Sequence, residues 1–244
     1  MTTTPYWVSA FLDLPADGFD RGVEFWQGVT GYTLSPSRGV DDEFATLVPP
    51  DGDDYLRVQR LADGPGRIHL DLHVDNPVVA AEAAVELGAH VLVRHESGYV
   101  VLRSPGGFTF CFVRHEASVR PRPAVWADGN RSQVDQVCLD LPPEQYDAEL
   151  AFWQALTGWD LRDIGYSEFA RLLPPDSLPL RWLVQRLDDP GDAVVAHFDI
   201  GCDDRTAETA RHVALGATVV RVHGEWTVLT DPVGTAYCIT DRKP

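Results

Sequence analysis

The chain has 244 residues, of which 44% are hydrophobic and 23% charged, and this length suits either one large domain or two ordinary ones. Its 20 Lys and Arg residues stand against 37 Asp and Glu residues, which gives a formal net charge of −17 at pH 7. Such a charge repels phosphate backbones and anionic lipid surfaces, which argues against nucleic-acid and membrane binding and favours a small-molecule ligand that is cationic or neutral.

Hydrophobic periodicity predicts a strand, a helix and three strands at the start of the chain, and then the same succession again. The first module is expected to have a strand over residues 8–14, a helix over 19–29 that stops at Gly31, and strands near 32–34, 44–48 and 55–61. The second module is expected to have a strand over 67–74, a helix over 77–87 closed by Gly88, and strands near 90–94, 99–103 and 109–113. The first half of the chain therefore reads as two βαβββ modules.

The second half of the chain repeats the first at an offset of 125 to 128 residues. Trp26 returns as Trp153, and the pattern His69-x-Asp71 returns as His197-x-Asp199. Such a repeat predicts two homologous domains. We expect a first domain at 1–116 with modules at about 6–62 and 66–115, a linker at 117–131, and a second domain at 132–244 with modules at about 133–188 and 194–241.

The strand that carries each His-x-Asp pattern is expected to present it to a ligand. Helices that cover one side of a sheet leave its other face free to form a cleft. Side chains two residues apart share a face of a strand, so His69 and Asp71 should face the cleft while Leu70 faces the helix. The same alternation places His197 and Asp199 on the cleft side in the second domain.

These residues resemble the glyoxalase-like domains of the vicinal oxygen chelate superfamily, which includes glyoxalase I, bleomycin-resistance proteins and extradiol dioxygenases. The resemblance rests on the paired βαβββ modules, the segments around His69 and His197, the Leu-Gly-Ala after the second helix, and the closing segments 104–111 and 231–238. It implies an α+β fold in which four modules pair into two domains with concave mixed sheets, each with its own cleft.

In metal-dependent members of that superfamily, a divalent cation is held by His or Glu residues on the first and last strands of two modules. The corresponding positions are Ser9, Gln59, His69 and Cys111 in the first domain and Gln136, Gln185, His197 and Cys238 in the second. Only the histidines match that pattern, and amides and hydroxyls bind transition metals poorly. We therefore expect no cofactor and a degenerate metal site. A divalent metal, if one binds, would be held by His69 and Cys111, or by His197 and Cys238.

His69 and His197 are the candidate catalytic residues, because imidazole ordinarily changes charge near neutral pH and can act as a general acid or base. An alternative is that they belong to a buried hydrogen-bonded network without catalysis. Residues two apart on a strand have Cα atoms about 6.5–7 Å apart, so His69 and Asp71 are not expected to form a tight pair unaided. The candidate ligand-binding residues are Ser9, Arg57, Gln59, Asp71, Cys111, Gln136, Gln185, Asp199 and Cys238.

Other conspicuous residues are expected to be structural or to line the clefts. Trp26 and Trp153 have helical spacing and should lie in the core. The aromatic residues expected on cleft walls are Tyr99, Trp182 and Trp226. The acidic run at 51–54 is expected to form a solvated turn.

The sequence predicts a glyoxalase-like protein of small-molecule-binding or lyase type, and it leaves open whether the chain is an enzyme. One alternative is a protein that binds a drug or natural product without chemistry, like the bleomycin-resistance proteins. A second is a metal-dependent lyase or isomerase with an unusual His/Cys/Gln ligand set. No signal or membrane segment is recognisable, so we expect a cytoplasmic protein. It should be a monomer with an internal pseudo-dimer, or a homodimer.

Overall fold

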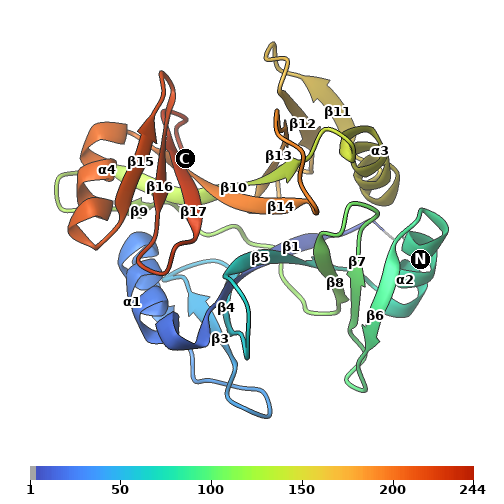
Figure 1. The fold of residues 1–244 in the computed structure, drawn as a ribbon. Helices are drawn as coiled ribbons and strands as arrows, with labels where there is room; N and C mark the ends of the chain where they lie inside the picture. Colours follow the sequence, from blue (N-terminus) through green and yellow to red (C-terminus); the bar gives the residue numbers. More distant parts are fainter. Residues whose placement is uncertain (1–3) are drawn as a thin grey trace. The chain divides into compact units, whose positions relative to one another are not determined.

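The computed structural model describes residues 4–244, and its elements follow the expected succession (Figure 1). The elements of the first repeat are β1 (Trp7–Leu14), α1 (Phe19–Thr30), β2 (Thr33–Leu34), β3 (Phe44–Val48), β4 (Leu56–Arg60), β5 (Arg67–His73), α2 (Pro77–Glu86), β6 (His90–Arg94), β7 (Val100–Arg103) and β8 (Thr109–Val113). Those of the linker and the second repeat are β9 (Ala124–Val125), β10 (Arg131–Leu141), α3 (Tyr146–Thr157), β11 (Asp160–Asp163), β12 (Phe169–Leu173), β13 (Arg181–Arg186), β14 (Val195–Cys202), α4 (Arg205–Ala214), β15 (Thr218–Val222), β16 (Trp226–Thr230) and β17 (Ala236–Thr240).

Each repeat forms one mixed β-sheet. The strand order is β2-β3-β4-β1-β5-β8-β7-β6 in the first repeat and β11-β12-β13-β10-β14-β17-β16-β15 in the second, where β9 also pairs with β10. The pairs β5–β8 and β14–β17 are parallel, whereas the hairpins around them are antiparallel. This arrangement confirms the α+β fold of four βαβββ modules.

Local sequence signals explain where the helices begin and end. Helices α1 and α3 stop at Gly31 and Gly158, which adopt left-handed φ angles of 71° and 69° that an L side chain rarely adopts. Helix α2 begins after Asn76, whose side chain accepts hydrogen bonds from two backbone N–H groups, and α4 begins in the same way after Asp204. Among residues 4–244, no helix is long and apolar enough to cross a membrane.

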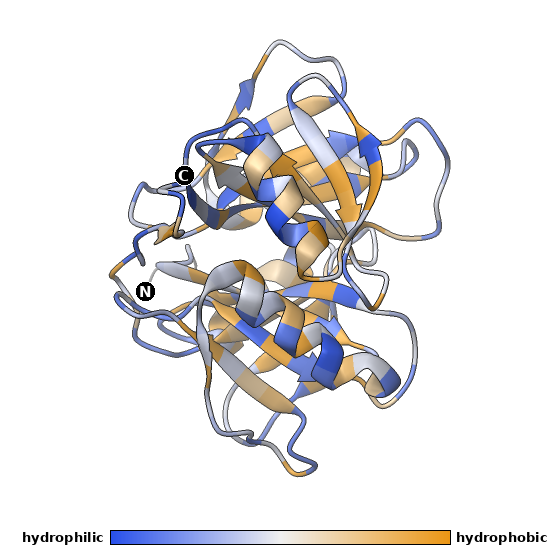
Figure 2. Ribbon diagram, turned by 90° about the vertical axis from the view of Figure 1, so that its left-hand side faces the viewer, coloured by the Kyte–Doolittle hydropathy of each residue, from blue (hydrophilic) through white to orange (hydrophobic). Residues whose placement is uncertain are grey.

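The strands alternate between a buried face and a more accessible one. On β4, Leu56 and Val58 are fully buried, while Arg57 and Gln59 between them are half-buried. β13 and β16 show the same alternation, and Figure 2 shows hydrophobic residues along the strands. On these strands the buried face supplies the core and the alternate face carries Arg57, Gln59 and Gln185. The other candidate ligand-binding residues are themselves buried, namely Ser9, Asp71, Cys111, Gln136, Asp199 and Cys238.

The chain folds into two compact units, and each combines segments of both repeats. Of the described residues, the first unit comprises 4–10, 69–118 and 138–196, and the second comprises 11–68, 119–137 and 197–244. Four of the five boundaries between the units fall inside the central strands β1, β5, β10 and β14, and the fifth falls in the linker, between residues 118 and 119. The domain limits drawn from the repeat stay a prediction about the sequence, because the compact units follow a different division.

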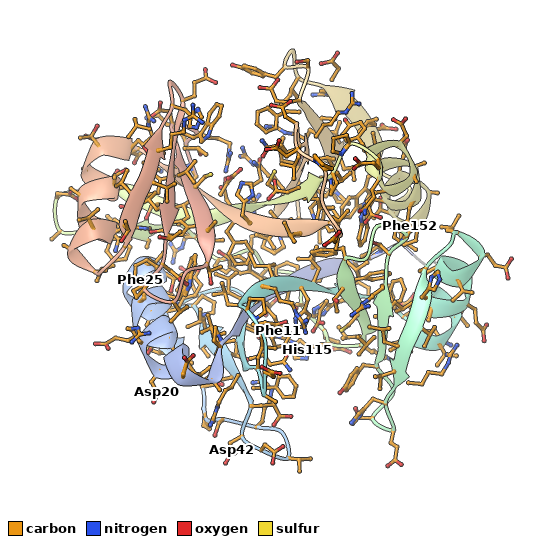
Figure 3. The ribbon with its side chains drawn as sticks, in the orientation of Figure 1. Phe11, Asp20, Phe25, Asp42, His115 and Phe152 are labelled. Carbon is orange, nitrogen blue, oxygen red and sulfur yellow. The ribbon has the colours of Figure 1, made fainter. Side chains whose placement is uncertain are left out.

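Aromatic side chains show how helices of one repeat pack on strands of the other. In the first unit, the ring of Trp153 on α3 lies 5.1 Å from that of Phe110 on β8. In the second unit, Trp26 on α1 lies 5.3 Å from Tyr237 on β17. Figure 3 labels Phe25 and Phe152, which are buried in these two cores beside the tryptophans. Both tryptophans are core residues, as expected.

The expectation that Trp182 lines a cleft is wrong. Its side chain is fully buried, and its ring lies 5.2 Å from the rings of both Trp153 and Trp159. On β13, Val184 shares its face and is buried, whereas Leu183 and Gln185 on the alternate face are half-buried. The phase of the alternation therefore assigns Trp182 to the core of the first unit.

The acidic turn at 51–54 lies at the surface, as expected, and its carboxylates also anchor the linker. Asp51 accepts hydrogen bonds from the backbone N–H and the side chain of Arg122, at 2.9 and 2.7 Å. Asp53 accepts one from the backbone N–H of Val119 at 2.9 Å and donates its own N–H to the Val119 carbonyl at 2.7 Å. Between them, Gly52 lies so close to Pro121 that an added Cβ would be 2.6 Å from its nitrogen.

Candidate functional site

Two parallel strands bring His197, Asp199 and Cys238 together, and we call these residues the second-repeat cluster. His197 and Asp199 lie two residues apart on β14, and Asp199 is directly opposite Cys238 on β17. One potential ligand atom from each of the three residues lies within 4.8 Å of the others. The His197 Nε2 atom is 3.5 Å from Asp199 Oδ1.

The same geometry recurs in the first repeat with His69, Asp71 and Cys111, the first-repeat cluster. Asp71 on β5 is opposite Cys111 on β8, and the three potential ligand atoms again lie within 4.8 Å of one another. The distance from His69 Nε2 to Asp71 Oδ1 is 3.9 Å, which is too long for a hydrogen bond. This distance agrees with the expectation that the two residues do not form a tight pair.

The two clusters differ in their access to solvent. The side chains of His69 and Asp71 are 8% and 6% exposed, whereas that of His197 is 16% exposed. Both cysteines are buried. The second-repeat cluster is therefore the more accessible of the two, through its imidazole.

Gln136 on β10 completes the second-repeat cluster. It is 1% exposed, and its Nε2 donates a short hydrogen bond to Asp199 Oδ2. Burial alone raises the pKa of Asp199. Its neighbours outweigh burial and hold that pKa below its usual value: His197 through a hydrogen bond and its charge, Arg242 through its charge, and Gln136 through a hydrogen bond.

The orientation of the Gln136 amide follows from this charge. An ionised carboxylate only accepts hydrogen bonds, so Gln136 must turn its NH₂ group toward Asp199. Its carbonyl oxygen Oε1 is then buried with no hydrogen-bond partner among the residues that the structure describes. Buried polar atoms nearly always have a partner, so this oxygen is available to accept from a hydrogen-bond donor or to bind a cation.

Ser9, the counterpart of Gln136 on β1, is engaged in a different way. Its Oγ lies 2.9 Å from His73 Nε2, and His73 Nδ1 lies 2.9 Å from the carbonyl oxygen of His115, which Figure 3 labels. The carbonyl accepts the proton on Nδ1, so in the neutral imidazole Nε2 accepts the Ser9 hydroxyl proton. Ser9 and His73 are fully buried, and the serine hydroxyl is committed to this interaction.

The remaining candidates lie on other strands. Arg57 forms an ion pair with Asp54 at 3.1 Å and lies over the ring of Phe11, while Gln59 is opposite Phe44 on the neighbouring strand. These residues belong to the second compact unit, whereas the first-repeat cluster belongs to the first. Gln185 belongs to the first unit, opposite Phe169, and the second-repeat cluster to the second. Neither Gln59 nor Gln185 is therefore assigned to a cluster.

The donor set in the second repeat fits a divalent transition-metal ion. An imidazole nitrogen, a carboxylate oxygen and a thiolate sulfur are strong donors, and two ligands of one tetrahedral zinc ion lie about 3.3–3.8 Å apart. The 3.5 Å between His197 and Asp199 falls in that range. The sequence predicted one His and one Cys as possible metal ligands in each repeat. It missed the aspartate as a third donor, although Asp199 was placed on the correct strand face.

The sequence profile described as "Glyoxalase-like domain" matches residues 9–113 and 136–240. No curated protein matches the chain.

Solved structures with a similar fold include several enzymes. The Mn(II)-bound glyoxalase from Novosphingobium aromaticivorans is 20% identical, with a TM-score of 0.65 over 98% of this chain and 81% of that one. The 2,2',3-trihydroxybiphenyl 1,2-dioxygenase from Sphingomonas wittichii strain RW1 is 14% identical, with a TM-score of 0.63 over 95% and 88%. A mutant of 4-hydroxymandelate synthase from Streptomyces coelicolor is 15% identical, with a TM-score of 0.64 over 98% and 94%. At these identities the likeness establishes a shared fold.

Proposed function

The chain belongs to the glyoxalase-like domain family, and from this premise we propose that it is a small-molecule enzyme of the lyase or isomerase type that uses a divalent metal ion. The observation that supports the proposal is the convergence of imidazole, carboxylate and thiol atoms within 4.8 Å at equivalent positions of both repeats. The same three residue types stand at these positions in both repeats, and each set lies on a pair of parallel strands.

In the second repeat, the ion would be held by His197, Asp199 and Cys238, with the carbonyl oxygen of Gln136 available as a further donor. A bound ion of this kind acts as a Lewis acid that polarises an oxygen of the substrate. Gln136 Nε2 fixes the Asp199 carboxylate through its hydrogen bond, and Arg242 is itself held by Asp135. These contacts hold the donors in place before a ligand arrives.

Elemental analysis of the purified protein after reconstitution with divalent ions tests this proposal. We expect bound metal in the wild-type protein and at least a tenfold weaker affinity in His197→Ala, because that substitution removes a strong donor. A wild-type protein that retains no metal after reconstitution would contradict the assignment. Screening small carbonyl and phenolic compounds for turnover by the metal-loaded protein then identifies the substrate class.

A second candidate function is the binding of a small molecule without catalysis. The hydrogen bond between Ser9 and His73 favours this function for the first repeat. The net charge of −17 suits a cationic ligand for such a protein. In a thermal-shift screen with cationic natural products, stabilisation without turnover would support sequestration, and turnover of any stabilising compound would reject it. The ligand's charge, the cytoplasmic location and the oligomeric state stay predictions.

A further inference from the structure

We propose that the two repeats have different roles: the second-repeat cluster binds a zinc-class ion through the Cys238 thiolate, while the Ser9–His73 pair leaves the first-repeat cluster without a complete ligand set. This inference rests on the proposed function and adds to it the number of ions per chain, the repeat that binds the ion and the class of metal. Four residues carry the argument, namely Gln136 and Gly201 in the second repeat and Ser9 and His73 in the first.

The difference begins at the first strand of each repeat. Gln136 donates through Nε2 to Asp199, and its Oε1 stays buried without a partner among the described residues. At the equivalent place, Ser9 Oγ is 2.9 Å from His73 Nε2. The second repeat therefore offers an unpartnered carbonyl oxygen beside its cluster, whereas the first repeat offers only a neutral hydroxyl whose proton is donated to His73 and whose oxygen is a weaker metal ligand than an amide oxygen.

The two first strands differ in their contacts because the neighbouring strands, β5 and β14, carry different residues at one equivalent position. Gly201 occupies the position in β14 that His73 occupies in β5. A Cβ atom at Gly201 would lie 2.8 Å from the carbonyl oxygen of Arg242 and 3.1 Å from Asp135 Oδ1. The Asp135–Arg242 ion pair thus occupies the space that an imidazole would need. No side chain at residue 201 can therefore engage Gln136 as His73 engages Ser9.

The donor types indicate which metal the second repeat selects. Thiolate and imidazole ligands favour Zn²⁺ and Co²⁺, whereas Mg²⁺ and Mn²⁺ favour oxygen ligands. Cys238 and His197 supply one sulfur and one nitrogen, and Asp199 and Gln136 supply oxygens. We therefore expect preference for Zn²⁺ or Co²⁺ over Mn²⁺, with release of the thiol proton to solvent as the metal–sulfur bond forms.

Cobalt substitution tests this inference by spectroscopy. Protein stripped of metal is titrated with Co²⁺, and the near-ultraviolet charge-transfer band from thiolate to cobalt is followed in the wild type, Cys238→Ser and the matched control Cys111→Ser. We expect one ion per chain, a band that Cys111→Ser retains, and loss of the band in Cys238→Ser. A competition titration with Zn²⁺ and Mn²⁺ should show at least tenfold tighter binding of Zn²⁺.

A second variant separates the loss of a metal ligand from the loss of the fold. Gln136→Ala leaves the second repeat with the same three donors as the first. We therefore expect this variant to bind Co²⁺ about 10–100-fold more weakly and to show the charge-transfer band only at correspondingly higher Co²⁺ concentrations. Circular dichroism of each variant establishes that the fold is retained. Two ions per chain, or a band lost in Cys111→Ser and kept in Cys238→Ser, would overturn the assignment to the second repeat while leaving the metal proposal intact. Absence of any ion in the wild type would overturn both.

Discussion

Glu208 on α4 is a fully buried carboxylate whose charge is balanced by neighbouring side chains. It accepts hydrogen bonds from Arg211 Nε at 3.0 Å and from Asn130 Nδ2 at 3.1 Å, and it contacts His212 Nε2 at 3.1 Å. Burial alone raises the pKa of Glu208, but the hydrogen bonds from His212, Arg211 and Ser132 outweigh burial and lower it to about 2. Glu208 is therefore ionised in the folded protein at neutral pH.

This carboxylate should make stability depend on pH in the acidic range. Its folded pKa of about 2 lies below the ordinary value of 4.5, so its contribution is present above about pH 4.5 and is lost as the pH falls toward 2. Urea unfolding of the wild type and Glu208→Gln should show a variant about 3–5 kcal/mol less stable at pH 7, with a difference that shrinks below pH 4.

The control for Glu208→Gln is Glu86→Gln, which changes an exposed acid on α2. We expect this control to change stability by less than about 0.5 kcal/mol at any of these pH values. A difference between Glu208→Gln and the wild type that stays constant from pH 7 to pH 2.5 would show that Glu208 does not contribute through its charge.

At the scale of the elements, the last turn of α1 is held by a residue of the other repeat. Arg211 on α4 donates to the carbonyl oxygens of Gly28 and Val29, at 2.7 and 2.9 Å. Its guanidinium also lies 3.6 Å from the ring centroid of Trp126 in the linker. The unpaired carbonyls at the end of α1 therefore find their partners on a different helix.

Replacing this guanidinium by an amine should loosen α1. Arg211→Lys keeps the charge but cannot donate to two carbonyls in a fixed fork, so we expect a loss of about 1.5–3 kcal/mol in unfolding free energy. Hydrogen exchange should rise at the last turn of α1, with Arg103→Lys at the exposed end of β7 as the control. Unchanged exchange across α1 in Arg211→Lys would contradict this role.

Hydrophobic periodicity and turn residues were enough to predict where the helices and strands lie in the sequence. They did not predict which helices and strands contact one another. The stops at Gly31 and Gly158 and the two-residue alternation of β4 depend on residues that are close in sequence, so the sequence predicts them. The approach of Asp199 to Cys238 depends on the register of two parallel strands, which the sequence does not reveal. The bond between Ser9 and His73 likewise joins strands 64 residues apart.

Trp182 shows a second limit of prediction from the sequence, which concerns how the core is packed. Both faces of β13 carry apolar residues, so alternation alone did not show which face packs inward. The apolar face of α3 predicted a buried Trp153, but an amphipathic helix does not specify which strands it covers. The choice of partner, here Phe110 from the other repeat, comes from the packing of the complete chain.

For the whole molecule, the division into two units predicts how the repeats behave apart. Each unit needs segments of both repeats, so the separate halves 1–116 and 132–244 each lack part of the core that the other half completes. We expect neither half alone to unfold cooperatively, and we expect the two halves, when refolded together, to regain the circular dichroism of the intact chain. A half that unfolds alone at the midpoint temperature of the full protein would show that each repeat is a self-sufficient domain.

The packing of helices from one repeat on strands of the other has an evolutionary consequence. A change at Trp153 alters the space available to Phe110, and a change at Trp26 alters the space available to Tyr237. We therefore expect compensating substitutions in the opposite copy of the duplicated segment. The copies can diverge at candidate ligand-binding positions, as they have at Ser9 and Gln136, while each core depends on residues of both copies.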